Sequence, residues 1–257
     1  MKRFFPLILL TIFALSAHAA PKREFYEIKI YTIETPDQEK MLDEFLKNAY
    51  LPALHRAGIT RVGVFKPIES DTLWFGKRMY VITPFSSLDQ FTALDASLQK
   101  DKAYLEAGKG YIDAPYNNPP YFRMESIILQ AFPDMPKGEA PKLSSPKSER
   151  VYELRSYEGH TEKIYKNKVQ MFNEGGEVTL FKRLGFNAVF YAEVLAGSRM
   201  PNLMYMTSFE NRAARDEHWK TFVADAEWKK LSSMPEYQHN VVRNNIFLLH
   251  PTEYSDL

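Results

Sequence analysis

Two stretches of this chain share one alternating pattern and lie about half a chain length apart. The stretch VYELRSY, residues 151–157, alternates between two faces as a strand does. The stretch YEIKIY, residues 26–31, repeats the alternation. One face of each predicted strand is formed by Tyr26, Ile28, Tyr152 and Leu154. The other face carries Glu27, Lys29, Tyr31, Glu153, Arg155 and Tyr157. The pattern predicts one structural unit used twice.

Each half of the chain predicts the order strand, helix, strand, strand, helix, strand. In the first half, the predicted strands cover residues 23–33, 59–65, 73–83 and 121–130, with helices at 35–58 and 86–107 and a loop at 108–120. In the second half, they cover residues 151–157, 186–194, 202–209 and 240–249, with helices at 160–184 and 210–231. Pro52 is expected to kink the first helix, and Gly175-Gly176 to interrupt the third. The order βαββαβ predicts two tandem ferredoxin-like units of the α+β class.

Matching residues outside the strand pattern also support a duplication. Residues 45–58 align with residues 172–185, which brings Arg56 onto Arg183. Further predicted pairs are Phe65 with Phe190, Met79-Tyr80 with Met204-Tyr205, and Arg123 with Arg243.

The chain divides into four predicted segments. Residues 1–20 are typical of a signal peptide, because Lys2 and Arg3 precede an apolar run that ends at the small-residue pattern Ala17-His18-Ala19. Residues 21–131 and 150–257 are the two units, and the Pro- and Lys-rich residues 132–149 form a linker. We therefore expect an exported protein, located in the periplasm or the extracellular medium.

Composition excludes several classes of protein. Without Lys2 and Arg3 the formal net charge changes from +1 to −1, so nucleic acid and anionic membrane surfaces are not expected partners. No second apolar run is long enough to span a membrane in the mature form. The chain contains no Cys, and its His residues show no metal-ligand spacing, so we predict no metal site.

The second half resembles a known family. The stretch YELRSY, the stretch LMYMTSFENRAAR (residues 203–215) and the following Trp-containing helix are similar to the NIPSNAP family. The resemblance covers residues 151–250 and is weaker over residues 24–130. It implies the dimeric α+β barrel fold, here as two units packed sheet to sheet in a pseudo-dimeric barrel. It implies no activity. The first repeat departs from the pattern, because residues 86–90 (SSLDQ) replace the segment with Arg212 and Arg215.

The polar strand faces are the main candidate site. We expect the helices of each unit to cover the apolar face, so that the polar face lies inside the barrel or at its rim. Buried charges must be paired or hydrogen-bonded. The pairs Glu27/Lys29 and Glu153/Arg155 therefore either set the registry of the two sheets or line a ligand pocket, in which Tyr31 and Tyr157 donate hydrogen bonds.

Two further kinds of residue are candidates. Arg123 and Arg243 on the last strands either pair with Glu27 and Glu153 or clamp a carboxylate. His160 and His218 are surface or capping histidines, or single haem ligands. We predict no cofactor, with haem and flavin left open.

Two classes of function fit these features. One is a protein that binds a small organic ligand or a partner protein in or at the rim of the barrel. The other is a cofactor-poor barrel enzyme, an oxygenase or isomerase, that uses a polar Tyr/Arg/His pocket. A homodimer through exposed strand edges is a further hypothesis.

Overall fold

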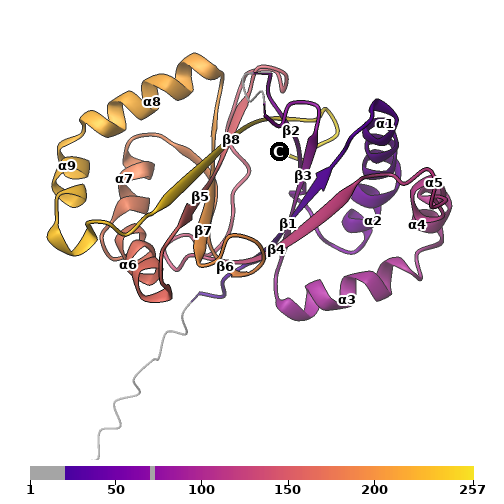
Figure 1. The fold of residues 1–257 in the computed structure, drawn as a ribbon, viewed down its shortest axis with the longest axis horizontal. Coiled ribbons are helices and arrows are strands. Elements are labelled where there is room, and N and C mark those ends of the chain that lie inside the picture. Colours follow the sequence, from indigo (N-terminus) through magenta and orange to yellow (C-terminus); the bar gives the residue numbers. More distant parts are fainter. Residues whose placement is uncertain (1–20, 70–72) are drawn as a thin grey trace, which may run out of the picture.

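The computed structural model describes residues 21–69 and 73–257, and its strands form one closed antiparallel barrel (Figure 1). The order around the barrel is β1-β3-β2-β8-β5-β7-β6-β4. The helices lie outside the barrel in two groups, α1–α5 on one side and α6–α9 on the other (Figure 1). The predicted signal peptide, residues 1–20, lies outside the described residues.

The first unit contains the strands β1 (Phe25–Thr32), β2 (Gly63–Pro67), β3 (Arg78–Phe85) and β4 (Arg123–Ala131). Its helices are α1 (Pro36–Phe45), the π-helix Leu46–Tyr50, α2 (Leu51–Arg56), α3 (Leu88–Leu98), α4 (Lys102–Ala107) and α5 (Lys109–Ile112). The second unit contains β5 (Val151–Glu158), β6 (Asn187–Ala196), β7 (Asn202–Phe209) and β8 (Arg243–Pro251). Its helices are α6 (Glu162–Phe172), α7 (Glu177–Arg183), α8 (Arg212–Ala224), α9 (Ala226–Ser232) and a short 3₁₀ turn, Pro235–Tyr237.

The barrel closes through strand pairs between the two units. β4 pairs with β6 over the registers Leu129–Val194 to Ala131–Ala192, and β8 pairs with β2 from Phe65–Pro251 onward. The two predicted ferredoxin-like units are therefore confirmed, and they form a pseudo-dimeric barrel within one chain. Because the sheet closes on itself, the open strand edges expected to support a homodimer are not available.

The predicted orientation of the first strand in each unit is wrong. Tyr26, Ile28, Tyr152 and Leu154 belong to the apolar core inside the barrel. Tyr31 packs in the cluster beneath the helices of the first unit, and Tyr157 packs against the corresponding cluster of the second. All eight strands converge on the barrel interior, which buries uncharged side chains. The helix-covered outer face supplies partners for charged ones. The alternating sequence pattern shows which residues share a face of the strand, but it does not show which face points into the barrel and which lies beneath the helices.

Several predicted boundaries and pairings also change. Residues 73–77 form turns, so the third strand begins at Arg78, and α5 occupies part of the predicted loop at 108–120. Lys29 and Arg155 are equivalent residues of the first strand in each unit. Lys29 lies opposite Val81, and Arg155 lies opposite Tyr205. The counterpart of Tyr205 is therefore Val81 and not the predicted Tyr80. The predicted equivalence of Phe65 and Phe190 is also wrong. Phe65 lies opposite Tyr80 and Phe190 lies opposite Met206, and these two partners are not at equivalent positions.

Both units interrupt their first helix at the same place. In the first unit the helix widens into the π-helix Leu46–Tyr50, just before Pro52. In the second unit α6 ends at Phe172, and α7 begins after Gly176, whose φ is +84°. Only glycine adopts this backbone conformation at little cost, so the predicted interruption at Gly175-Gly176 is confirmed.

The predicted linker packs against the barrel. The Glu24 N–H donates to the Pro136 carbonyl (2.8 Å) and the Glu139 N–H to the Val189 carbonyl (3.0 Å). Among the helices of the described ranges, none is long and apolar enough to cross a bilayer.

Candidate functional site

The polar residues of β5 converge beneath α8 rather than inside the barrel. Glu153 is fully buried and accepts hydrogen bonds from Arg215 (2.7 and 3.1 Å) and Trp219 Nε1 (2.8 Å) of α8. Burial alone would raise the pKa of Glu153. The hydrogen bond from Arg215 and the charge of Arg155 outweigh burial, so the pKa lies below its ordinary value. Glu153 therefore anchors α8 to the sheet as a carboxylate.

Arg155 connects this carboxylate to a pair of tyrosines. Its Nε donates to Glu153 at 2.5 Å, and its Nη1 donates to the Tyr157 hydroxyl at 3.1 Å. The Tyr157 and Tyr205 hydroxyls lie 2.9 Å apart. The guanidinium lies 3.7 Å from the centre of the Trp219 ring, within the range of a cation–π contact. The predicted Glu153/Arg155 ion pair is confirmed, but it lies between sheet and helix and not between the two sheets.

A second buried ion pair lies on the helices that face β5. Lys168 Nζ of α6 donates to Glu177 Oε2 of α7 at 2.8 Å, and both side chains are almost completely buried. The ammonium also lies 4.8 Å from the Phe172 ring centre and 5.8 Å from that of Trp228. Burial raises the pKa of the Glu177 carboxyl, although Lys168 opposes this shift.

These groups surround a cavity of about 320 Å³. That volume is within the usual range of small-molecule sites, about 300–1,000 Å³. The cavity is lined by Arg155, Tyr157, Lys168, Glu177, Arg215, Trp219, Phe222, Val223 and Trp228. We call it the sheet–helix pocket. It combines three cations with Glu177 in its wall, and the carboxylate of Glu153 lies behind Arg155 and Arg215. Asp216 also pairs with Arg215 from outside the pocket, at 2.8 Å, so the cations outnumber the carboxylates only among the lining residues themselves.

The corresponding residues of the first unit form a different arrangement. Glu27 accepts a hydrogen bond from Ser126 (2.7 Å) and lies 3.7 Å from Lys29, which donates to the Tyr50 hydroxyl at 3.1 Å. The predicted Glu27/Lys29 pair is therefore confirmed, again beneath the helices. Tyr31 packs edge-on against Tyr121. The ring of Phe45 stacks on those of Tyr50 and Tyr111 beneath the same helices.

Besides those of the first strand, three further predicted site residues lie apart from the pocket. Arg123 and Arg243 begin β4 and β8, are exposed and do not pair with Glu27 or Glu153, whose partners are described above. Both lie at strand ends, where solvent reaches the guanidinium. Their predicted equivalence is confirmed, because each lies opposite the last residue of the neighbouring strand. His160 is exposed in the loop after β5. Nowhere in residues 21–69 and 73–257 do three His, Asp or Glu side chains form a potential metal site.

Several pocket residues could not be identified from the sequence. Lys168 belongs to the apolar stripe of α6, and Trp219 and Trp228 fit an ordinary helical core. Arg215 lies in the first turn of α8, where an acid would suit the helix N-terminus better, and this position indicates a structural ion pair or a contact with an anion. Its bonds to Glu153 explain it. Glu177 could have been noticed only as an acid that directly follows Gly175-Gly176.

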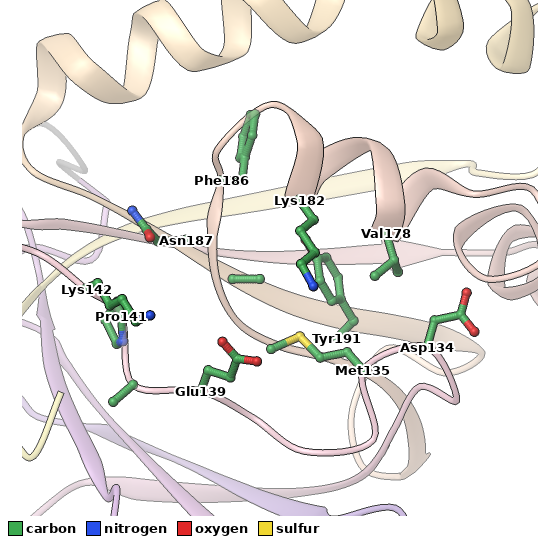
Figure 2. A pocket seen from close by; sticks show the side chains of 12 residues that line it. Asp134, Met135, Glu139, Pro141, Lys142, Val178, Lys182, Phe186, Asn187 and Tyr191 are labelled. Atoms are coloured by element: carbon green, nitrogen blue, oxygen red, sulfur yellow. The ribbon is translucent and has the colours of Figure 1, made fainter. Parts of the chain in front are cut away.

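Another cavity, of about 270 Å³, lies between the linker and the second unit (Figure 2). Figure 2 shows Glu139 and Met135 of the linker on one side and Lys182 and Tyr191 on the other. The charged side chains at this cavity, which include Glu139, Lys142 and Lys182, are exposed. Exposed charges contribute about 1 kcal/mol or less to an ion pair, so they select a ligand weakly. The sheet–helix pocket is the stronger candidate.

Comparison with known families finds one match, in the second half of the chain. Residues 152–256 match the family model NIPSNAP. No curated protein matches the chain significantly.

Solved structures resemble the whole chain in fold. A candidate monooxygenase from Lactobacillus acidophilus has 13% identity and a TM-score of 0.58, covering 89% of this chain and 94% of its own. An anthrone oxidase-like protein has 10% identity and a TM-score of 0.53, with coverages of 91% and 93%. A NIPSNAP family protein from Agrobacterium tumefaciens has 20% identity and a TM-score of 0.37, with coverages of 42% and 98%. At the identities of the first two, the likeness concerns the barrel fold.

Proposed function

We propose that this protein, whose residues 152–256 match the NIPSNAP family model, binds a small planar organic anion in the sheet–helix pocket. The observation that carries the proposal is that three cations and one carboxylate line an aromatic-walled cavity. A concave cavity of this size fits a small molecule better than a segment of a partner protein.

Arg155 is the residue best placed to hold the anionic group. It is only 8% exposed, so its charge is weakly screened. It shares the single carboxylate of Glu153 with Arg215. A guanidinium has five N–H donors, and its contacts with Glu153 and Tyr157 leave capacity for a carboxylate or phenolate of the ligand.

The aromatic walls favour a planar ligand. Trp219, Phe222 and Trp228 line the same cavity, and Phe222 and Trp228 have ring centres 4.5 Å apart. Stacked or edge-on contacts with such rings contribute roughly 0.5–1.5 kcal/mol beyond the burial of apolar area. Aliphatic acids of similar volume lack this contribution, and we expect them to bind more weakly.

Binding of 1-naphthoate, with neutral 1-naphthamide as the comparison, tests the proposal. Trp219 and Trp228 line the pocket, so quenching of tryptophan fluorescence reports occupancy. Arg155→Met removes a charge-assisted contact worth about 1.5–3 kcal/mol, so we expect its affinity for naphthoate to fall roughly 10- to 100-fold. The exposed Arg243 of the same unit supplies the matched control, Arg243→Met, whose affinity we expect to remain unchanged.

Equal binding of naphthoate and naphthamide would contradict the proposal. Equal loss in the Arg155 and Arg243 variants would also contradict it, because the effect would then come from the net charge of the molecule. Far-UV circular dichroism of both variants establishes that they are folded.

A second candidate function is a cofactor-poor oxygenase. The names of two structures that share the fold over most of this chain, a candidate monooxygenase and an anthrone oxidase-like protein, support it, as does the Tyr157–Tyr205 pair beside Arg155. Oxygen uptake with an anthrone as substrate is the relevant measurement. Uptake that does not exceed the protein-free rate would count against this candidate.

We also propose that the protein is exported. The basic start, the apolar run and the Ala17-His18-Ala19 pattern of the sequence support export to the periplasm or beyond. The intact mass of the protein from the native organism should correspond to a chain that begins at Ala20 or Pro21. A mass that includes Met1 in the soluble fraction would contradict export.

A further inference from the structure

Glu177 faces the sheet–helix pocket in an unusual setting for a carboxylate. It is 2% exposed and lines the cavity, and in the described part of the chain Lys168 is the one hydrogen-bond partner of its side chain. Glu153, by contrast, accepts hydrogen bonds from three side chains. The hydrogen bonds of Glu153 therefore hold the fold together, whereas one carboxylate oxygen of Glu177 remains available to a ligand.

The fold itself does not require the Lys168–Glu177 pair. The alignment of residues 45–58 with 172–185 can be extended by four residues toward the N-terminus. It then places Met41 at the position of Lys168 and Tyr50 at the position of Glu177. Its helices pack on the sheet in the same way without a buried ion pair there. Buried ion pairs contribute little net stability compared with well-packed apolar residues. The charged pair therefore points to a role in the pocket.

The surroundings suit a group that both takes and releases a proton. Burial raises the pKa of the Glu177 carboxyl above its ordinary value, which makes the carboxylate a stronger base than an exposed one. Lys168 and Arg155 are the cations that oppose this shift, and the Tyr191 and Tyr205 phenols are the other titratable groups nearby. Lys168 places a positive charge beside the carboxylate, where an enolate oxygen would develop negative charge.

We propose that Glu177 transfers a proton between carbon and oxygen of a bound aryl 2-oxo acid, so that the pocket interconverts its keto and enol forms. This inference rests on the proposed function, because Arg155 would hold the carboxylate and the tryptophans the ring. The Glu177 carboxylate removes a proton from the carbon next to the carbonyl. The C–H electron pair forms the C=C bond, and the carbonyl pair moves onto oxygen. Glu177 then returns the proton to that oxygen, so no other reactant is needed.

Phenylpyruvate is the probe that tests this step. Two readouts apply: the ultraviolet absorbance of the enol, and exchange of the C3 protons for deuterium followed by NMR. We expect the wild-type protein to accelerate both above the buffer rate. Glu177→Gln should lower the rate constant at saturation by roughly 100-fold, as expected for loss of a general base, with the Kd for phenylpyruvate changed only a few-fold.

Two variants separate chemistry from folding. Glu177→Gln leaves Lys168 as a buried charge without its partner, so the double variant Lys168→Met/Glu177→Gln removes both charges and should restore stability but not activity. Glu174→Gln changes an exposed acid three residues away and should leave the rate unchanged.

The outcomes distinguish this inference from the proposed function. Binding of naphthoate without binding of phenylpyruvate overturns the inference and leaves the proposed function in place. Binding of phenylpyruvate without acceleration, or equal acceleration by the Glu177→Gln protein, also overturns it. Failure of both anions to bind overturns the two together.

Discussion

At the scale of single residues, the two buried glutamates of the second unit differ because their partners differ. Glu153 accepts hydrogen bonds from two guanidinium groups and an indole, which outweigh the cost of burial. Glu177 has one ammonium partner, and burial prevails. The sequence shows both as ordinary acids, and only their surroundings assign one to structure and the other to the pocket.

The Glu153 carboxylate should stabilise the fold in a pH-dependent way. Its pKa is lower in the folded than in the unfolded protein, so its contribution is present above the unfolded value and decreases as the pH falls through the folded value. We expect Glu153→Gln to lower the free energy of unfolding by about 3 kcal/mol at pH 7, because Arg155 and Arg215 lose their shared partner. The difference from wild type should shrink below about pH 4. Urea denaturation at several pH values measures it.

Glu217→Gln on α8 is the matched control, because the Glu217 side chain is 67% exposed. We expect its effect to stay within about 0.5 kcal/mol at every pH. A Glu153→Gln protein as stable as this control at pH 7 would show that the buried network contributes little.

At the scale of elements, the interruption of the first helix positions the pocket. Gly176 ends the turn after α6 with φ +84°, and Glu177 begins α7 immediately afterwards. In the first unit a π-helix occupies the equivalent place, and the buried Tyr50 at its end takes the aligned position of Glu177. A change in backbone geometry thus accompanies the exchange of a tyrosine for an acid at this position.

Gly176→Ala should therefore lower both stability and pocket occupancy. A Cβ at Gly176 would meet no atom within 4 Å, so the whole cost is the strain of a left-handed backbone, about 1–2 kcal/mol. Relief of that strain would displace Glu177, and we expect weaker binding of phenylpyruvate. Thermal unfolding and fluorescence titration are the measurements. Gly110→Ala, at an equally open helical position with an ordinary φ, should be neutral or stabilising. Equal stability of the two variants would contradict this explanation.

At the scale of the whole molecule, each unit completes the sheet of the other. β2 and β4 of the first unit have β8 and β6 of the second as neighbours, and the core inside the barrel takes side chains from both units. A separate unit would expose this core and two strand edges. The second unit contains the pocket, and the first supplies the other half of the barrel.

We expect residues 21–257 to unfold in one cooperative transition. Tryptophan fluorescence reports mainly on Trp219 and Trp228 of the second unit, whereas far-UV circular dichroism reports on both, and their urea curves should coincide. Residues 21–131 and 150–257, produced separately, should be dimeric or aggregated in size-exclusion chromatography with light scattering. Two resolved transitions, or stable monomeric halves, would contradict this expectation.

The sequence by itself determined the duplication, the order of elements in each unit and the resemblance to the NIPSNAP family, because these depend on local periodicity and on residue identity. It also identified Glu153, Arg155 and Tyr157 as one group, since alternate residues of a strand share a face. Only the tertiary structure decided that this face lies beneath the helices, because both faces of a barrel strand are covered. The pocket likewise depends on Lys168 of α6, Glu177 of α7, and Arg215 and Trp219 of α8. Nothing local to those helices indicates that their side chains meet.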